Sequence, residues 1–188
     1  SISGATISNL VIGSTSGSFI ESNSRNTGGL AGIAINSTIR NVIVNLDVTS
    51  SQNNVGGLVG FAQNTTFSDV IANSDTKGKA VVGGIVGRME GGSIDYGANY
   101  GRSLGTNSVG GMIDGSDGDN PTQGGYIGGI VGNAIGSAAH PITLTNVQFS
   151  GSAVRLYSGL ANVNDPIKFI GGIVGLMNGY TTVSQAYV

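Results

Sequence analysis

Residues 56–60 read GGLVG, and variants of this pentad return four more times along the chain. The other copies are GGLAG at 28–32 and GGIVG at 83–87, 128–132 and 171–175. The first three copies begin at Gly28, Gly56 and Gly83, so they are almost evenly spaced. A period of roughly 20 to 50 residues is the signature of a stacked array whose units bury their apolar faces against their neighbours. The sequence therefore predicts a repeat protein.

The repeat is less regular after the third pentad. A further step of the same length from Gly83 reaches Gly110, where the chain reads GGMIDG, and we interpret this stretch as a degenerate fourth copy. The next copies begin at Gly128, after a shorter step, and at Gly171, after a much longer one. We therefore expect irregular insertions near residues 112–126 and 155–169.

A second block in most units alternates apolar with polar residues. It begins with a hydroxyl residue, continues with an apolar one, and usually has Asn, Asp or Gln in fourth place. Such alternation predicts a strand with one buried face, and stacked amides in fourth place are expected to hydrogen-bond along the array. The blocks are TISNLVI from 6, TIRNVIV from 38, TFSDVIA from 66, SIDYGAN from 93, TLTNVQF from 143 and TVSQAYV from 182, and the polar column is Asn9, Asn41, Asp69, Asn146 and Gln185.

Together the two blocks predict an all-β chain, a parallel β-solenoid (right-handed β-helix) of about five to six coils with a period near 27 residues. No window sustains the apolar spacing of a helix. Residues 1–188 are expected to form a single solenoid domain. Because the chain begins and ends on a strand block without a cap, we expect an excerpt of a longer chain or end-to-end self-association, which light scattering would detect.

The pentad glycines are expected to be structural. Each stands where a Cβ atom would clash with a neighbouring coil or where φ must be positive. They are Gly28, Gly29, Gly32, Gly56, Gly57, Gly60, Gly83, Gly84, Gly87, Gly128, Gly129, Gly132, Gly171, Gly172 and Gly175.

Composition narrows the class of protein. Charged residues make up 10% of the chain, against roughly 25% in typical soluble domains, so the surface is polar without being ionic, as in many extracellular proteins. Eight scattered Lys and Arg and a net charge of −2 argue against nucleic acid as a partner. No apolar run is long enough to insert into a membrane. The absence of cysteine excludes disulfides and thiolate chemistry.

The pentads followed by strands such as TIRNV resemble the GLUG motif, a repeat named for its Gly-Leu-hydrophobic-Gly core, and the resemblance covers Thr6 to Val188. Such repeats occur in filamentous-haemagglutinin-like adhesins and in non-catalytic regions of immunoglobulin A peptidases. The resemblance implies a non-catalytic extracellular or cell-surface module, a stalk or presenting scaffold, with a protein or glycan ligand. The peptidase relatives keep their chemistry in a zinc domain with an H-E-x-x-H helix, whereas this chain has a single histidine, His140.

Two alternative functions stay open at this stage. A carbohydrate-processing β-helix enzyme, either a lyase or a hydrolase, would need converging carboxylates. Asp69 and Asp95 are the pair that successive units bring nearest to one column, and cleavage of a glycan panel would test them. An ice-binding solenoid would need a regular outward threonine ladder, which thermal hysteresis would test. Its candidates are Thr6, Thr38, Thr66, Thr143 and Thr182.

No cofactor is expected except calcium. Asp114, Asp117 and Asp119 lie in a glycine-containing loop and offer the hard oxygen ligands that calcium prefers. Their spacing is not that of an EF-hand, and a solvated acidic turn is the alternative interpretation. A calcium titration would distinguish the two.

Two further sets of residues are candidates for recognition. Asn36 and Asn64 fit the N-x-S/T sequon and fall at equivalent positions of two units, so they would lie on one exposed edge and are candidate glycosylation sites. The second insertion is expected to carry binding residues outside the regular coil. These partner-binding candidates are Arg155, Tyr157, Lys168 and Phe169.

Overall fold

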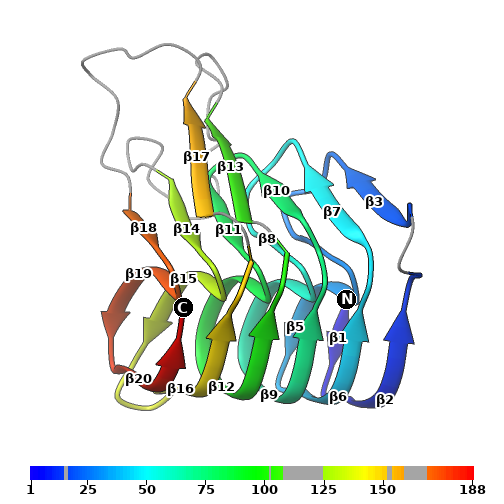
Figure 1. Ribbon diagram of the computed structural model, residues 1–188. Helices are drawn as coiled ribbons and strands as arrows, with labels where there is room; N and C mark the ends of the chain where they lie inside the picture. Colours follow the sequence, from blue (N-terminus) through cyan, green and yellow to red (C-terminus); the bar gives the residue numbers. More distant parts are fainter. Residues whose placement is uncertain (15–16, 102, 108–124, 152–153, 159–168) are drawn as a thin grey trace.

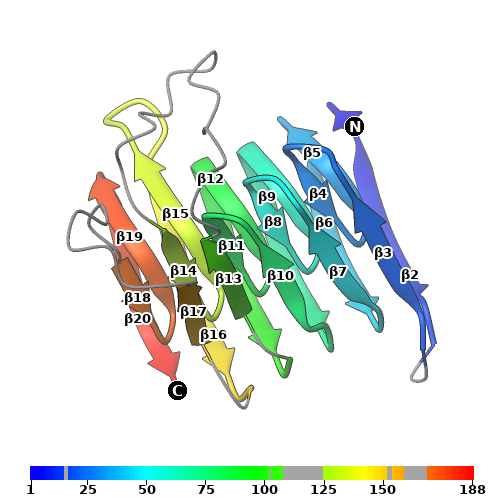
Figure 2. The ribbon, with the colours of Figure 1, turned by 90° about the horizontal axis from the view of Figure 1, so that it is seen from above.

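The structure of the chain is a computed structural model that describes residues 1–14, 17–101, 103–107, 125–151, 154–158 and 169–188. Within these ranges every regular element is a β-strand, and each strand pairs in parallel with the equivalent strand of the next coil (Figure 1). Seen from above, the coils follow one another from the N-terminal to the C-terminal end (Figure 2). The predicted parallel β-solenoid is confirmed.

Three parallel sheets form the walls of the solenoid. The largest has ten strands and contains both the end of each pentad and the alternating block, joined in two coils into single long strands. Its strands are β1 (Ile2–Ser3), β2 (Thr6–Ile12), β5 (Ala31–Ile35), β6 (Thr38–Val44), β9 (Val59–Ala72), β12 (Val86–Asn99), β15 (Val131–Gly136), β16 (Ile142–Phe149), β19 (Val174–Gly179) and β20 (Thr181–Tyr187).

The other two sheets have five strands each. The second contains β3 (Phe19–Ser22), β7 (Asp47–Ser50), β10 (Thr76–Gly78), β13 (Ser103–Asn107) and β17 (Val154–Ser158). The third contains β4 (Thr27–Gly28), β8 (Val55–Gly56), β11 (Val81–Gly83), β14 (Tyr126–Gly128) and β18 (Phe169–Gly171).

The pentads stack in one column, and this corrects the prediction of a coil at Gly110. In the third sheet Gly28 pairs with Gly56, Gly56 with Gly83, Gly83 with Gly128, and Gly128 with Gly171. Because Gly83 lies directly beside Gly128, no coil comes between them. The extra residues fall between β13 and β14, and those of the next coil fall between β17 and β18, so both lengthened connections occur at the same corner.

Close packing explains the pentad glycines, mostly against a neighbouring coil and in places, such as Gly171 and Gly172, against residues of the same coil. An added Cβ atom at any of them would come within 3.0 Å of another atom, a separation that packed side chains do not adopt. At Gly84 it would meet the carbonyl oxygen of Gly129 and the side chain of Asn99. None of the pentad glycines has a positive φ. Steric contact is therefore the reason for these glycines, as predicted, and the alternative reason, a positive φ, is wrong.

The residues of the predicted polar column have a left-handed backbone. Asn9, Asn41, Asp69, Asn146 and Gln185 have φ between 50° and 57°, which short polar side chains tolerate better than others. In the third coil the column holds Tyr96, with a φ of 54°, because Asp95 pairs with Ser68 one position earlier. Asp95 therefore lies next to the column of Asp69 and not in it.

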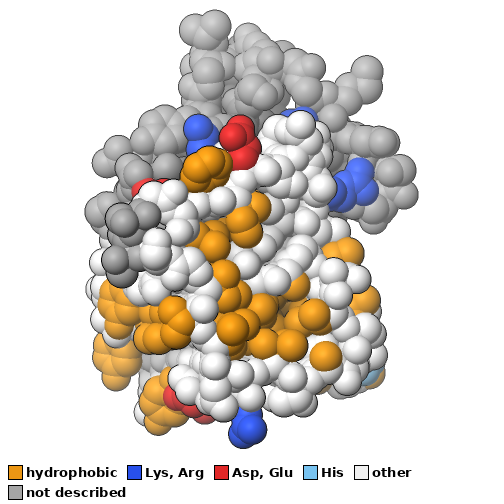
Figure 3. Space-filling view, turned by 90° about the vertical axis from the view of Figure 1, so that its right-hand side faces the viewer, with side chains coloured by type: hydrophobic (Ala, Val, Ile, Leu, Met, Phe, Trp, Pro, Cys, Tyr) orange, Lys and Arg blue, Asp and Glu red, His pale blue; other side chains and the backbone are white. Residues whose placement is uncertain are grey.

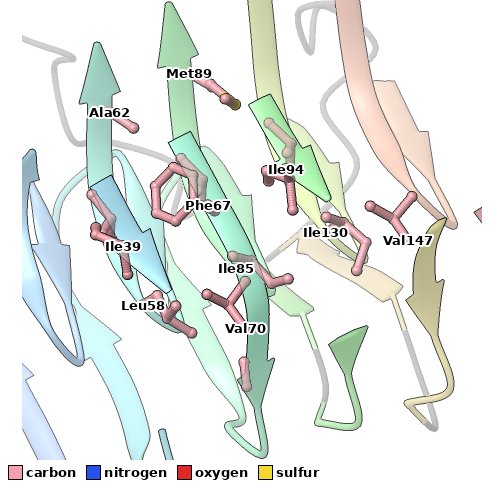
Figure 4. Close-up of a cluster of buried hydrophobic side chains, with 14 of the residues drawn as sticks. Ile39, Leu58, Ala62, Phe67, Val70, Ile85, Met89, Ile94, Ile130 and Val147 are labelled. Atoms are coloured by element: carbon pink, nitrogen blue, oxygen red, sulfur yellow. The ribbon is translucent and has the colours of Figure 1, made fainter. Parts of the chain in front are cut away.

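The inward-facing side chains form a continuous core along the axis. Figure 4 shows Phe67, Ile85, Ile94 and Ile130 meeting inside the coil. All four side chains are fully buried. Inward-facing residues at equivalent positions stack from one coil to the next, so each coil buries its apolar face against its neighbour.

Side-chain amides add hydrogen bonds between coils at the corners. Asn54 Nδ2 donates to Asn26 Oδ1 at 2.9 Å, and Asn73 Nδ2 donates to Asn45 Oδ1 at 2.7 Å. The buried Asn99 donates from Nδ2 to the Gly129 carbonyl at 2.8 Å and links a corner to the glycine column of the next coil. Amide hydrogen bonds between coils therefore occur mainly at these corners, and among the described residues the predicted column contains the bond from Asn41 to Asn9.

The end of the solenoid near β2 and β3 presents apolar side chains. Figure 3 shows hydrophobic groups gathered over the middle of this face. Ile2, Ile7, Ile12, Ile20 and Leu30 are the partly buried residues that pack against the core there. Among the described residues no helix is long and apolar enough to cross a membrane.

Candidate functional site

The acidic loop predicted to bind calcium lies outside the described residues. Asp114, Asp117 and Asp119 all fall between residues 108 and 124. In the part of the chain that the structure describes, no group of three His, Cys, Asp or Glu side chains is placed to hold a metal ion. Calcium binding therefore stays a prediction.

The partner-binding candidates lie mostly in regular coil strands. Arg155 and Tyr157 belong to β17 and pair with Leu104 and Thr106 of β13. Phe169 begins β18, and its ring lies 5.8 Å from that of Tyr126 in the coil before. Lys168 lies outside the described residues. The expectation that Arg155, Tyr157 and Phe169 stand outside the coil is therefore wrong, since the lengthened connection begins only after Ser158.

The two sequon asparagines occupy equivalent corners, as expected. Asn36 and Asn64 both have a φ of 47°, because the chain turns there between the two halves of the large sheet. Asn36 is exposed and Asn64 is half-buried. Their positive φ gives both asparagines a backbone role that is independent of glycosylation.

The hydroxyl ladder is longer than predicted. Thr6, Thr38, Thr66, Ser93, Thr143 and Thr182 pair in register from one coil to the next, and no coil without a block interrupts them. The outward column two residues later contains Arg40 and Asp95 beside Ser68. Charged side chains in this second column depart from the paired threonines that ice binding needs.

A groove on the outer face of the large sheet gathers the strongest candidate residues. It crosses β6, β9, β12 and β16 and encloses about 290 Å³, close to the lower end of the range of roughly 300 to 1,000 Å³ for ligand sites. We call it the Tyr96 groove. Its lining residues are Asn41, Ile43, Asp69, Ile71, Tyr96, Gly97, Ala98, Asn146 and Gln148.

Tyr96 departs from the pattern of its column. It is a bulky residue with a φ of 54°, and 59% of its surface is exposed. A left-handed conformation costs about 1–2 kcal/mol for a residue of this kind, and the ring is only partly buried. Strained residues of this type cluster at functional sites.

The floor and the rim of the groove differ in chemistry. Ile43, Ile71 and Ala98 are outward-facing neighbours on adjacent strands, and they form an apolar floor. Ala98 is the smallest of the three, so the floor is lowest beside Tyr96. The polar rim is formed by Asn41, Asp69, Asn146 and Gln148.

Hydrogen bonds hold three of the rim side chains in place. Asn41 Nδ2 donates to Asn9 Oδ1 at 2.8 Å, and Asn146 Nδ2 donates to Asp95 Oδ1 at 3.1 Å. Gln148 Nε2 donates to the Ser150 hydroxyl at 2.6 Å. One N–H of each amide is thus engaged with a neighbour, which leaves the amide oxygen as an acceptor and the second N–H as a donor. Asp95 supports the rim through Asn146 and does not pair with Asp69.

A second hollow of about 310 Å³ lies on the other half of the large sheet. Phe61, Arg88 and Glu90 line it, and Arg88 forms an ion pair with Glu90 at 2.7 Å. Glu90 also accepts a hydrogen bond from Gln63 at 3.3 Å. Arg88 and Glu90 thus pair with each other, while the buried Oδ1 of Asn54, which also lines this hollow, has no hydrogen-bond partner among the described residues.

The Tyr96 groove was not predicted from the sequence, because Tyr96 was not assigned to the polar column. Placing SIDY from 93 under TFSD from 66 puts Tyr96, and not Asp95, in the column of Asp69. An aromatic residue in a column of Asn, Asp and Gln was the available signal. His140 lies in a tight turn, with its backbone nitrogen donating to the Ser137 carbonyl at 3.2 Å.

Comparisons with known proteins bear on the fold. No protein-family model matches the sequence, and no curated protein resembles it significantly. The crystal structure of a "putative immunoglobulin A1 protease" from Bacteroides ovatus is similar, with a TM-score of 0.56 at 18% sequence identity. The match covers 97% of this chain and 57% of that one, so the chain corresponds to less than two thirds of the similar protein. At this identity the likeness shows a shared β-rich architecture.

Proposed function

We propose that the chain is a non-catalytic structural and adhesive module of an extracellular or cell-surface protein, which presents its outer face to a protein or glycan ligand. The observation that carries this proposal is the uninterrupted register of the coils. Parallel pairing of every coil with the next makes a stiff scaffold on which outward columns lie at fixed positions. Repeat proteins of this kind commonly use such extended surfaces for binding.

The chemistry of the described residues supports a binding role over a catalytic one. Asp69 and Asp95, the pair of carboxylates that a β-helix enzyme would need, belong to different columns, and Asp95 accepts a hydrogen bond from Asn146. The similar protein from Bacteroides ovatus is named a protease. However, the zinc helix of the immunoglobulin A peptidases needs two histidines, and this chain has one.

Adhesion of coated beads tests the proposal. Beads carrying the chain are expected to be retained on a panel of immobilised glycans and extracellular-matrix proteins, while beads carrying the heat-unfolded chain are washed off. The same glycans incubated with the chain in solution should keep their length by mass spectrometry. Shortened glycans, or equal retention of the folded and unfolded chains, would contradict the proposal.

A further inference from the structure

We propose that the Tyr96 groove binds a neutral saccharide, with one sugar ring stacked on the Tyr96 side chain. This inference rests on the proposed adhesive function and names the ligand class and the residues. It is carried by three properties of the groove, namely the exposed aromatic ring, the acceptor-rich rim and the charge.

The aromatic ring and the floor suit the apolar face of a sugar. A pyranose ring carries C–H groups on its faces and hydroxyl groups around its edge. Tyr96 offers an exposed ring, and large aromatic side chains supply apolar contact area together with a polar tip. Ile71 and Ala98 continue the apolar surface beside it. A sugar lying against Tyr96 would therefore cover the floor with its C–H face.

The rim suits the hydroxyl groups of the same sugar. The amide nitrogens of Asn41, Asn146 and Gln148 already donate to neighbouring side chains. Asp69 is exposed, and no interaction within the described part of the chain uses its carboxylate. The rim therefore presents oxygen acceptors together with the second N–H of each amide, and sugar hydroxyls can donate to the former and accept from the latter.

The charge of the groove selects neutral sugars over acidic ones. Asp69 lies on the rim and Asp95 lies behind it, hydrogen-bonded to Asn146. No Lys or Arg is among the described residues that line the groove. A uronate or sialate would bring its carboxylate next to Asp69 without a cation to pair with, and like charges at short range repel. A neutral glycan meets no such penalty.

Titration of the full chain with defined probes tests this inference. The probes are neutral gluco-, manno- and galacto-oligosaccharides, with oligogalacturonate as the acidic control and a lysine-rich peptide as the cationic control. At least one neutral probe is expected to bind, and oligogalacturonate is not. Tyr96→Asn should weaken that binding at least tenfold, because it removes the ring. Tyr96→Phe, which keeps the ring, should stay within about threefold.

Two controls separate binding from folding. Asn suits the left-handed backbone of this column, so Tyr96→Asn should keep or raise the melting temperature, by about 2–4 °C for each kcal/mol of relieved strain. Tyr180 is similarly exposed, at 63% against 59% for Tyr96, but it does not line the groove. Tyr180→Asn should therefore leave the affinity unchanged.

Three results would overturn the inference. The first is that no neutral probe binds. The second is that Tyr96→Asn leaves the affinity for a neutral probe unchanged. The third is that only the cationic peptide binds. The bead assay keeps the two proposals distinguishable. If beads carrying Tyr96→Asn are retained as well as the original beads, the adhesive function stands and the saccharide site is wrong.

Discussion

Replacing Gly84 with Ala is expected to destabilise the solenoid by about 3 kcal/mol, the upper part of the usual range for overpacking a well-packed site. The added Cβ atom would meet the Gly129 carbonyl oxygen in the next coil and the side chain of Asn99. Asn99 Nδ2 donates to that same carbonyl at 2.8 Å, and the Gly84 carbonyl accepts from Gly57 in the previous coil. Relief of the clash would therefore disturb contacts on both sides of the coil.

Thermal unfolding followed by circular dichroism would measure this effect. A loss of about 3 kcal/mol corresponds to a fall in the melting temperature of about 6–12 °C for a chain of this size. Gly4→Asn is the matched control, because Gly4 has a φ of 59° and a Cβ atom added there would have nothing within 4 Å. Its column continues with Asn36 and Asn64. An equal effect of the two substitutions would contradict the packing role of the pentad glycines.

Phe67→Ala is expected to have the largest effect of any core truncation, about 3–5 kcal/mol. Phe67 is fully buried and is the largest of the fully buried side chains in the described residues. Its ring lies inside the coil, between Ile39 and Ile94 of the same column in the two adjacent coils (Figure 4). A cavity there would remove contacts from three coils at once.

Denaturant unfolding is the appropriate measurement, since it gives the free energy directly. Phe19→Ala is the control, because Phe19 is 71% exposed at the N-terminal end of the solenoid. Its removal should change the free energy of unfolding by no more than about 0.5 kcal/mol, as for most surface substitutions. A loss below about 1 kcal/mol for Phe67→Ala, well under the usual range for such truncations, would show that the core is not packed around this ring.

The architecture was predictable because repetition made local signals agree. One alternating block is ambiguous, but TIRNVIV and TFSDVIA stand at the same distance after their pentads, and Thr38 pairs with Thr66 as that spacing requires. The glycine pairs identified the places of closest approach between coils. A parallel solenoid accounts for both the alternating blocks and the glycine pairs, and the observed strand register agrees with both.

The spacing between repeats, taken alone, led to a wrong prediction at Gly110. A step of the regular length from Gly83 predicts another coil there, although GGMIDG is followed by no alternating block. In the structure, Gly83 and Gly128 are neighbours because the coil is closed by backbone pairing, which tolerates a longer connection at a corner. The same reasoning explains why Arg155 and Tyr157 lie in β17 while the extra length follows Ser158.

The candidate site was less predictable than the fold, because it depends on neighbours across four coils. Asp69, Tyr96 and Asn146 are far apart in sequence and meet only through the pairing of β9, β12 and β16. Sequence composition gave no hint of which outward residues would surround a hollow. Only the exceptional aromatic residue in the polar column pointed to the place.

The central claim is that the coils that begin with the pentads at Gly83 and Gly128 are direct neighbours. This register stacks the pentads and forms the Tyr96 groove. A pair of introduced cysteines, Ser93→Cys with Thr143→Cys, tests it in a chain that has no other cysteine. These residues pair across β12 and β16, and paired strands lie about 4.8 Å apart, within the range of roughly 4.4–6.8 Å between Cα atoms of disulfides.

The measurement is free-thiol titration of the folded protein under mild oxidation. The account predicts that the Ser93–Thr143 pair closes into an intramolecular disulfide. The control pair, Thr66→Cys with Thr143→Cys, should stay reduced because it is separated by two strand spacings, about 9.6 Å. Free thiols in the folded Ser93–Thr143 variant, or equal cross-linking of the control, would contradict this register and remove the groove with it.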